Sequence, residues 1–145
     1  MVKKPKQNSE ENQQELVFKL SMFEQQIQQL QQQLQAVEQG IVEMNSLDLG
    51  LDELVGSKGK EILAPIGRGI FVKTRLLDEK LSVDIGEKKF IKKSIPDTKK
   101  IIKEQIKKLE EVKSELTQKM EETSGKLQQM LMDVQAKEMV KGKEK

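Results

Sequence analysis

An unbroken series of apolar residues at helical spacing constrains this chain more than any other feature of its sequence. Between residues 10 and 47, apolar side chains recur at alternating intervals of four and three. They are Leu16, Leu20, Phe23, Ile27, Leu30, Leu34, Val37, Ile41 and Met44. This heptad pattern predicts an α-helix with one narrow apolar seam. The seam cannot be buried by a single helix, so the helix needs a partner. The intervening positions are largely glutamine, which favours helix and keeps the outer face polar.

A second helix with a similar seam is predicted from residue 95 to residue 140. Its seam positions are Ile95, Ile102, Ile106, Leu109, Leu116, Met120, Leu127, Met130 and Val134, interrupted by Lys99, Lys113 and Thr123. Pro96 suits the first turn of this helix, and either Ser94 or Ile95 is its capping residue. Since the two helices have similar lengths, folding the chain back between them lets one seam face the other.

The segment between the helices, residues 61–94, has the pattern of two successive β-hairpins. Apolar residues alternate along four short runs, with turns at Gly67–Gly69 and Gly86–Lys88. Seven of the alternating residues are predicted to form contacts between subunits: Ile62, Ala64, Ile66, Ile70, Val72, Val83 and Ile85. Two hairpins without a covering layer are marginal in water and have open edges, so this segment predicts an oligomer.

The predicted fold class is therefore α+β and mainly α: a long antiparallel coiled-coil hairpin with two β-hairpins inserted between its helices. We expect one domain over residues 10–140, with a first helix at 10–50, hairpins at 61–94 and a second helix at 95–140. Residues 1–9 are expected to be disordered and residues 141–145 to fray.

Composition argues against an enzyme. The chain has no cysteine and no histidine, which removes thiol chemistry, the usual general base and the commonest metal ligand. Gly67–Gly69 is too short for a phosphate-binding loop, and paired glutamates such as Glu110 and Glu111 suit a solvated helix face. We expect no catalytic, cofactor-binding or metal-binding residues. No secretory signal or run of ~20 apolar residues is present, so a soluble cytoplasmic protein without a membrane partner is expected.

A lysine cluster raises the possibility of nucleic-acid binding. Lys88, Lys89, Lys92 and Lys93 lie close together, but only 3% of residues are aromatic and the net charge is +2. Because stacking partners are nearly absent, we favour a strand edge on which lysines discourage unwanted strand pairing, and we expect no nucleic-acid partner.

The hairpin segment resembles the alpha class of the prefoldin family. Glu61 to Lys73, EILAPIGRGIFVK, is similar to the family's first hairpin, and Val83 to Gly86 with Phe90 to Ser94 is similar to its second. Two hairpins suggest the alpha class over the beta class. The chain departs from the family at Glu87–Lys89, where a second glycine is common, and at Lys92, where an acidic residue is common.

The resemblance implies an archaeal-type chaperone subunit without ATPase activity or cofactors. Family members form hexamers of two alpha-class and four beta-class subunits. Their hairpins build a double β-barrel platform, and the seven alternating residues named above are expected to form its interior. The tips of the coiled coils hold unfolded proteins and pass them to a group II chaperonin.

Apolar residues near the predicted open end of the coiled coil are candidates for client binding. Counting outward from the hairpins at ~1.5 Å per residue places Val17 and Phe18 level with Met130, Leu131 and Met132. Met130 belongs to the seam, whereas the other four lie outside it and are expected to face outward, as residues of an interaction site do. The alternative is that they cover a frayed helix end.

A different class of function is a structural or filament-forming coiled-coil tether that assembles through its β-hairpins. A simple tether has no need of a four-stranded insert, and a filament former assembles with itself alone. The hairpins therefore favour the chaperone subunit.

Overall fold

The fold is a pair of long helices joined through two β-hairpins. In chain order the elements of the computed structural model are α1 (Lys4–Leu54), β1 (Glu61–Gly67), β2 (Ile70–Arg75), β3 (Leu81–Gly86), β4 (Lys89–Lys93) and α2 (Ile95–Lys143). The structure describes residues 4–143, with side chains from 11 to 137. It divides into a hairpin unit, Gln39–Glu110, and an arm unit made of the chain up to Glu38 and from Glu111 onward.

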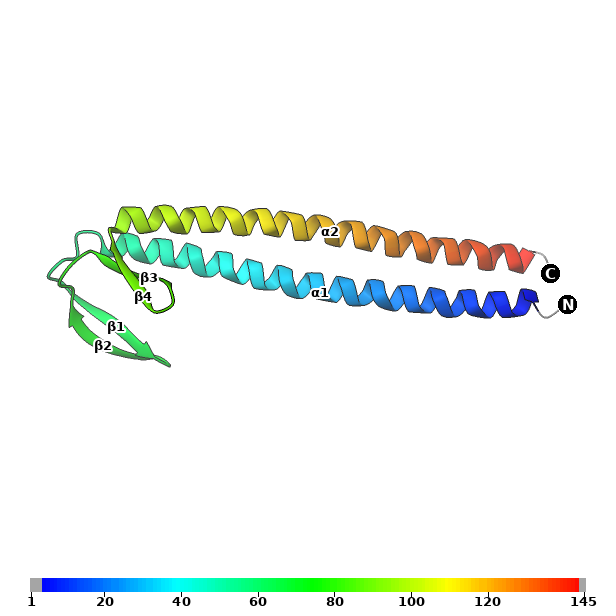
Figure 1. Ribbon diagram of the computed structural model, residues 1–145, viewed down its shortest axis with the longest axis horizontal. Coiled ribbons are helices and arrows are strands. Elements are labelled where there is room, and N and C mark those ends of the chain that lie inside the picture. The colour runs from blue at the N-terminus through cyan, green and yellow to red at the C-terminus, as the bar shows by residue number, and fades with distance from the viewer. Residues whose placement is uncertain (1–3, 144–145) are drawn as a thin grey trace. The chain divides into compact units, whose positions relative to one another are not determined.

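Within each unit, α1 and α2 lie side by side and run in opposite directions (Figure 1). In the arm unit Glu38 Oε1 lies 3.8 Å from Lys113 Nζ. In the hairpin unit Lys99 on α2 pairs with Asp52 on α1. All nine predicted seam residues of α1 are half-buried, and most of their neighbours are exposed. The predicted fold class, a mainly helical chain with two hairpins between antiparallel helices, is thus confirmed.

Deep burial is confined to a few seam residues. In the hairpin unit Leu51, Ile95 and Ile102 form a buried cluster, with Met44, Leu54, Leu81 and Ile106 packed against it. Leu116 is the buried apolar residue of the arm unit's described part. Because Leu81 begins β3, the second hairpin is attached to the helices through this cluster.

The start of α2 is held by a serine cap. Ser94 Oγ accepts a hydrogen bond of 3.2 Å from the backbone N–H of Asp97, which pairs one of the N–H groups that a helix start leaves free. Of the two candidates in the sequence, Ser94 is therefore the capping residue.

Both helices reach beyond the bounds expected for them. α1 begins at Lys4, inside the segment 1–9 that was expected to be disordered, and Pro5 fits a first helical turn because its missing N–H has no partner there anyway. α2 ends at Lys143, inside the segment expected to fray. Residues 1–3 and 144–145 lie outside the described residues.

Each hairpin is a separate two-stranded antiparallel sheet. In the first, Ala64 pairs with Val72 and Pro65 with Phe71. In the second, Val83 pairs with Ile91 and Asp84 with Phe90. The four predicted strands are all present.

The two hairpins end in the same way. The strand register shifts at Ile66 in the first and at Ile85 in the second, so each isoleucine is the extra residue of a β-bulge. A two-residue loop follows, and both of its residues have positive φ: 50° and 78° at Arg68 and Gly69. In the second loop φ is 52° at Glu87 and 60° at Lys88. Type I′ turns need such angles, and glycine adopts them at little cost.

A charged layer interrupts the apolar seam in the hairpin unit. Lys99 Nζ donates a hydrogen bond to Asp52 and lies 3.9 Å from Asp48 Oδ1. Asp48 continues the α1 seam after Met44, and its Oδ1 is shielded from solvent without a hydrogen-bond partner. A buried polar layer of this kind can specify which residues of two helices face each other.

The pKa of Lys99 is raised by this layer. The hydrogen bond to Asp52 has the largest effect, partial burial lowers the pKa, and the charges of Asp48 and Asp52 raise it further. A cation with a raised pKa stabilises the fold fully below its unfolded value, and the contribution is lost as the pH rises through the folded value. The contribution of Lys99 is therefore present at neutral pH and is lost in strong alkali.

The second loop is expected to be strained by Lys88, because a non-glycine residue in the left-handed region costs about 1 kcal/mol or more. Lys88→Gly should stabilise the second hairpin by about 1 kcal/mol, or roughly fivefold in the protection of the Val83 and Ile91 amides from hydrogen exchange. The matched change Gly69→Lys should weaken protection in the first hairpin. Equal protection before and after both substitutions would contradict strained loops.

The charged layer is expected to contribute specificity more than stability. Lys99→Met leaves Asp48 shielded without a countercharge, so the melting temperature should fall. The double change Asp48→Leu with Lys99→Leu restores an apolar layer and should raise the melting temperature above that of the unmodified chain. Thermal unfolding followed by circular dichroism measures both, and a double variant less stable than Lys99→Met would contradict this account.

Candidate functional site

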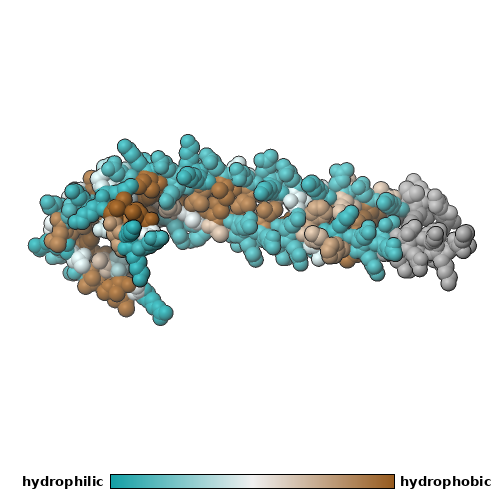
Figure 2. Space-filling view, viewed as in Figure 1, coloured by the Kyte–Doolittle hydropathy of each residue, from teal (hydrophilic) through white to brown (hydrophobic). Residues whose placement is uncertain are grey.

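The hairpins expose an apolar surface that nothing in the described part of the chain covers. Of the seven predicted assembly residues, Ile62, Ala64 and Val83 are half-buried, while Ile66, Ile70, Val72 and Ile85 are exposed. Ile66 at the first bulge is 71% exposed. The space-filling view shows hydrophobic surface over the hairpins (Figure 2). A single chain thus leaves unburied much of the surface that alternation along the strands predicted to be inside.

Two exposed phenylalanines add apolar surface on the other face of the hairpins, although alternation in the sequence did not identify them. Phe71 and Phe90 lie on the opposite face of their strands from Val72 and Ile91, and Phe90 is 64% exposed. The signal that could have found them is an internal repeat, I-G-x-x-x-F, at residues 66–71 and 85–90. Each hairpin end therefore presents the same pair, a bulged isoleucine and a phenylalanine.

The candidate client-binding residues lie in the arm unit and are largely exposed. Phe18 is 66% and Met132 is 70% exposed, and Val17 and Leu131 are also exposed. Met130 is half-buried in the seam, as its spacing indicates. These side chains have no described neighbour that removes them from solvent, which is typical of an interaction surface.

Val17 and Leu131 share one flank of the paired helices. Counting equal numbers of residues along the two helices from the Glu38–Lys113 pair brings Val17 opposite Val134. Val17 follows the seam residue Leu16 by one position, as Leu131 follows Met130. Because the helices run in opposite directions, residues one position after the seam lie on the same flank of both.

Phe18 and Met132 come next around each helix, on the outer sides of the pair that face away from the seam, and we name these two residues with Val17 and Leu131 the tip patch. On the other flank at the same level, the positions just before the seam are Lys19 and Asp133. At this level the flank of Val17 and Leu131 is therefore apolar and the opposite flank is charged.

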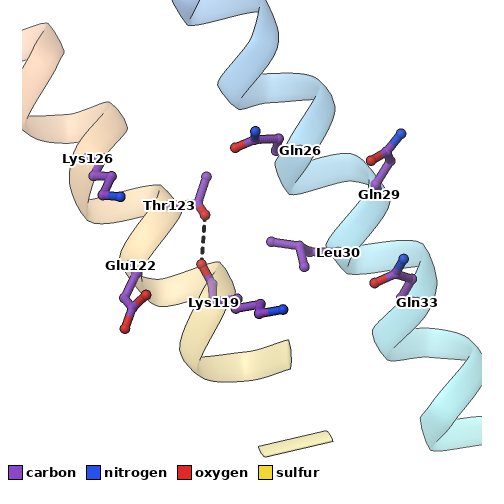
Figure 3. Close-up of a pocket in the computed structure, with 8 residues that line it drawn as sticks. All are labelled: Gln26, Gln29, Leu30, Gln33, Lys119, Glu122, Thr123 and Lys126. Carbon is purple, nitrogen blue, oxygen red and sulfur yellow. Dashed lines mark hydrogen bonds between the residues drawn. The ribbon is translucent and has the colours of Figure 1, made fainter. Parts of the chain in front are cut away.

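A hollow farther along the arm unit has a different character. It measures about 240 Å³ and is lined by Gln26, Gln29, Leu30, Gln33, Lys119, Glu122, Thr123 and Lys126. Leu30 points across it toward Thr123 (Figure 3). Thr123 is too short to fill its seam position, and its hydroxyl donates to the Lys119 carbonyl at 2.7 Å. With only one apolar residue lining it, we interpret the hollow as a packing gap.

Among the described residues, no cluster of three or more aspartates and glutamates is arranged to hold a metal ion. No helix in that part of the chain is long and apolar enough to cross a membrane.

The sequence matches the family model described as "Prefoldin subunit" over residues 23–138. The chain belongs to the prefoldin family. The match covers both hairpins, α1 from residue 23 and α2 up to residue 138, and it begins after Val17 and Phe18.

Curated relatives identify the class. The chain is 35% identical over 86 residues to prefoldin subunit alpha of Methanococcus aeolicus, covering 58% of this chain and 58% of that protein. It is 29% identical over 85 residues to prefoldin subunit alpha of Methanosphaera stadtmanae, covering 59% and 62%. The matches thus span about three fifths of these relatives' lengths. The chain is an alpha-class prefoldin subunit, as its two hairpins predicted.

A solved prefoldin structure shares the fold. The filamentous prefoldin of Methanocaldococcus jannaschii superposes with a TM-score of 0.69 at 22% sequence identity, covering 78% of this chain and 95% of that one. At this identity the likeness concerns the fold alone.

Proposed function

We propose that this chain is an ATP-independent chaperone subunit that assembles through its β-hairpins and holds unfolded or nascent proteins at its tip patch. The observation that carries the proposal is the exposure of two separate apolar surfaces on a chain of the prefoldin family: one on the hairpins and one on the arm. We propose that the hairpin surface serves permanent assembly and the arm surface serves transient binding of clients.

The hairpin surface is suited to permanent association. Strands with edges open and isoleucines exposed gain most by pairing and packing with strands of other subunits. The partners we propose are beta-class prefoldin subunits, in a hexamer of two alpha and four beta chains. Both hairpins supply apolar contacts: the first through Ile66 and Phe71, the second through Ile85 and Phe90.

The tip patch is suited to transient association with many partners. Methionine is flexible and polarizable, so a surface with Met132 adapts to clients of different shape. Phe18 adds a large apolar area that clients can cover. We propose that several arms hold one client together, and that the complex delivers it to a group II chaperonin in the cytoplasm.

Removing the tip patch should impair protection of clients. Phe18→Ser, Leu131→Ser and Met132→Ser combined in the assembled complex should weaken client binding roughly tenfold or more, because each apolar side chain contributes about 1.5–3 kcal/mol when fully buried. Suppression of the aggregation of a denatured test protein measures the loss.

The matched control replaces three exposed apolar residues outside the patch, Leu47, Val55 and Val112, by serine. Leu47 and Val112 each precede a seam position and so lie on the other flank. Native mass spectrometry checks that both triple variants assemble. Full protection by an intact complex of the tip variant would refute the tip assignment.

Charging the hairpin surface should prevent assembly. Ile66→Lys with Ile70→Lys places two cations on the apolar contact, and size-exclusion chromatography with and without a beta-class subunit should show a monomer in both cases. The control pair Leu47→Lys and Val112→Lys should assemble with the beta class as the unmodified chain does.

The same chromatography separates the chaperone subunit from a filament-forming tether. The unmodified chain should form a discrete hetero-oligomer only when the beta-class subunit is present. Long polymers formed by the chain alone would favour the tether, and a hexamer that persists in the charged hairpin variant would contradict the platform.

A further inference from the structure

A third exposed surface lies in the hairpin unit and is unlike the other two. It combines two apolar residues of α1, Val42 and Leu49, with three lysines of α2, Lys100, Lys103 and Lys107; we name it the lysine face. Val42 is 58% and Leu49 is 67% exposed, and the three lysines are exposed as well. Neither the seam nor the hairpins account for two large aliphatic side chains in this position.

The five residues share one flank of the paired helices. Val42 and Leu49 each follow a seam position of α1 by one residue, at Ile41 and Asp48, and each lysine likewise follows a seam position of α2, at Lys99, Ile102 and Ile106. Residues one position after the seam of antiparallel helices lie on the same side.

They also lie at the same level. Asp52 pairs with Lys99, and Leu109 Cδ1 is 3.6 Å from the place where a Cβ on Gly40 would stand. The stretch of α1 from Val42 to Leu49 therefore runs alongside the stretch of α2 from Lys100 to Lys107. The α1 side of the lysine face is apolar, and its α2 side is cationic.

The cations of this face make no ion pair within the described part of the chain. The ion pairs found there engage Lys99 and Lys113, and none includes Lys100, Lys103 or Lys107. The stripe of three lysines extends for about 10 Å at ~1.5 Å per residue, close to two helical turns. A partner that neutralises it needs acidic groups at the same helical spacing.

We propose that the lysine face docks an acidic amphipathic helix of a partner protein, laid along the furrow between α1 and α2. A third helix can pack against the flank of a two-helix coil, as amphipathic helices pack into apolar grooves. Its apolar stripe covers Val42 and Leu49, and carboxylates beside that stripe pair with the three lysines. Single-stranded nucleic acid fits less well, since the face has no aromatic side chain for bases to stack on.

The test uses the full chain, alone and in its native assembly, and a fluorescein-labelled synthetic helix with a leucine stripe flanked by glutamates. A second peptide has lysine at every glutamate. Fluorescence anisotropy should show the acidic peptide binding with a dissociation constant on the order of micromolar and weakening as salt rises. The basic peptide should not bind.

Variants separate the lysine face from general electrostatics. Lys100→Glu, Lys103→Glu and Lys107→Glu combined should weaken binding of the acidic peptide by roughly tenfold or more. The control triple, Lys108→Glu, Lys119→Glu and Lys126→Glu, makes the same change in charge at positions that precede seam residues and so lie on the other flank. It should change binding by less than about twofold.

The apolar part of the lysine face is tested by Val42→Ser combined with Leu49→Ser, which should also weaken binding. Lys→Gln versions of both lysine triples serve as milder substitutions in case the Lys→Glu variants misfold. Circular dichroism checks the helix content of every variant. Equal loss in the two lysine triples would overturn the proposal. So would binding of the basic peptide, no binding of the acidic peptide, or binding of single-stranded RNA or anionic vesicles at the same lysines in preference to the peptide.

Discussion

The structure depends on an apolar seam that two helices can only half bury. The nine predicted seam residues of α1 keep contact with solvent, and the deepest cluster of buried residues is Leu51, Ile95 and Ile102, where a hairpin residue joins the helices. A two-helix coil has no third layer to exclude water from its seam. Within each unit the helices are therefore held together by one narrow contact, and much of the apolar surface is left over for other chains.

The hairpins also expose apolar surface that no other layer of the chain covers in the described residues. Each is a two-stranded sheet with its own bulge and loop, and neither pairs with the other. Isolated hairpins are marginal in water, yet these carry exposed isoleucines and phenylalanines at equivalent positions. The surplus apolar surface makes physical sense in an oligomer, where strands from neighbouring chains supply both the hydrogen bonds and the covering layer.

The alignment of the two helices is specified by the positions at which the apolar seam is interrupted. The Lys99–Asp48–Asp52 layer replaces an apolar contact with charges that fit only one alignment of the helices. Farther along, Thr123 leaves a hollow beside Leu30. Such positions lower packing density, and the charged layer also penalises a shifted alignment, because a shift would place Asp48 against apolar side chains without a countercharge.

The sequence by itself determined the helices, the seam on each helix, the four strands and the two turns, because these follow from local periodicity and from turn residues such as Gly67 and Gly86. Heptad counting also identified Phe18 and Met132 as apolar residues outside the seam. Only the tertiary structure decided that Ser94 caps α2, that Ile66 and Ile85 are bulged and that Phe71 and Phe90 are exposed, since these depend on how a strand pairs or a loop closes. The alignment of the helices also had to come from the structure. A heptad repeat is nearly unchanged by a shift of seven residues, whereas the contacts of Lys99 and Lys113 select one alignment and so decide which side chains share a flank.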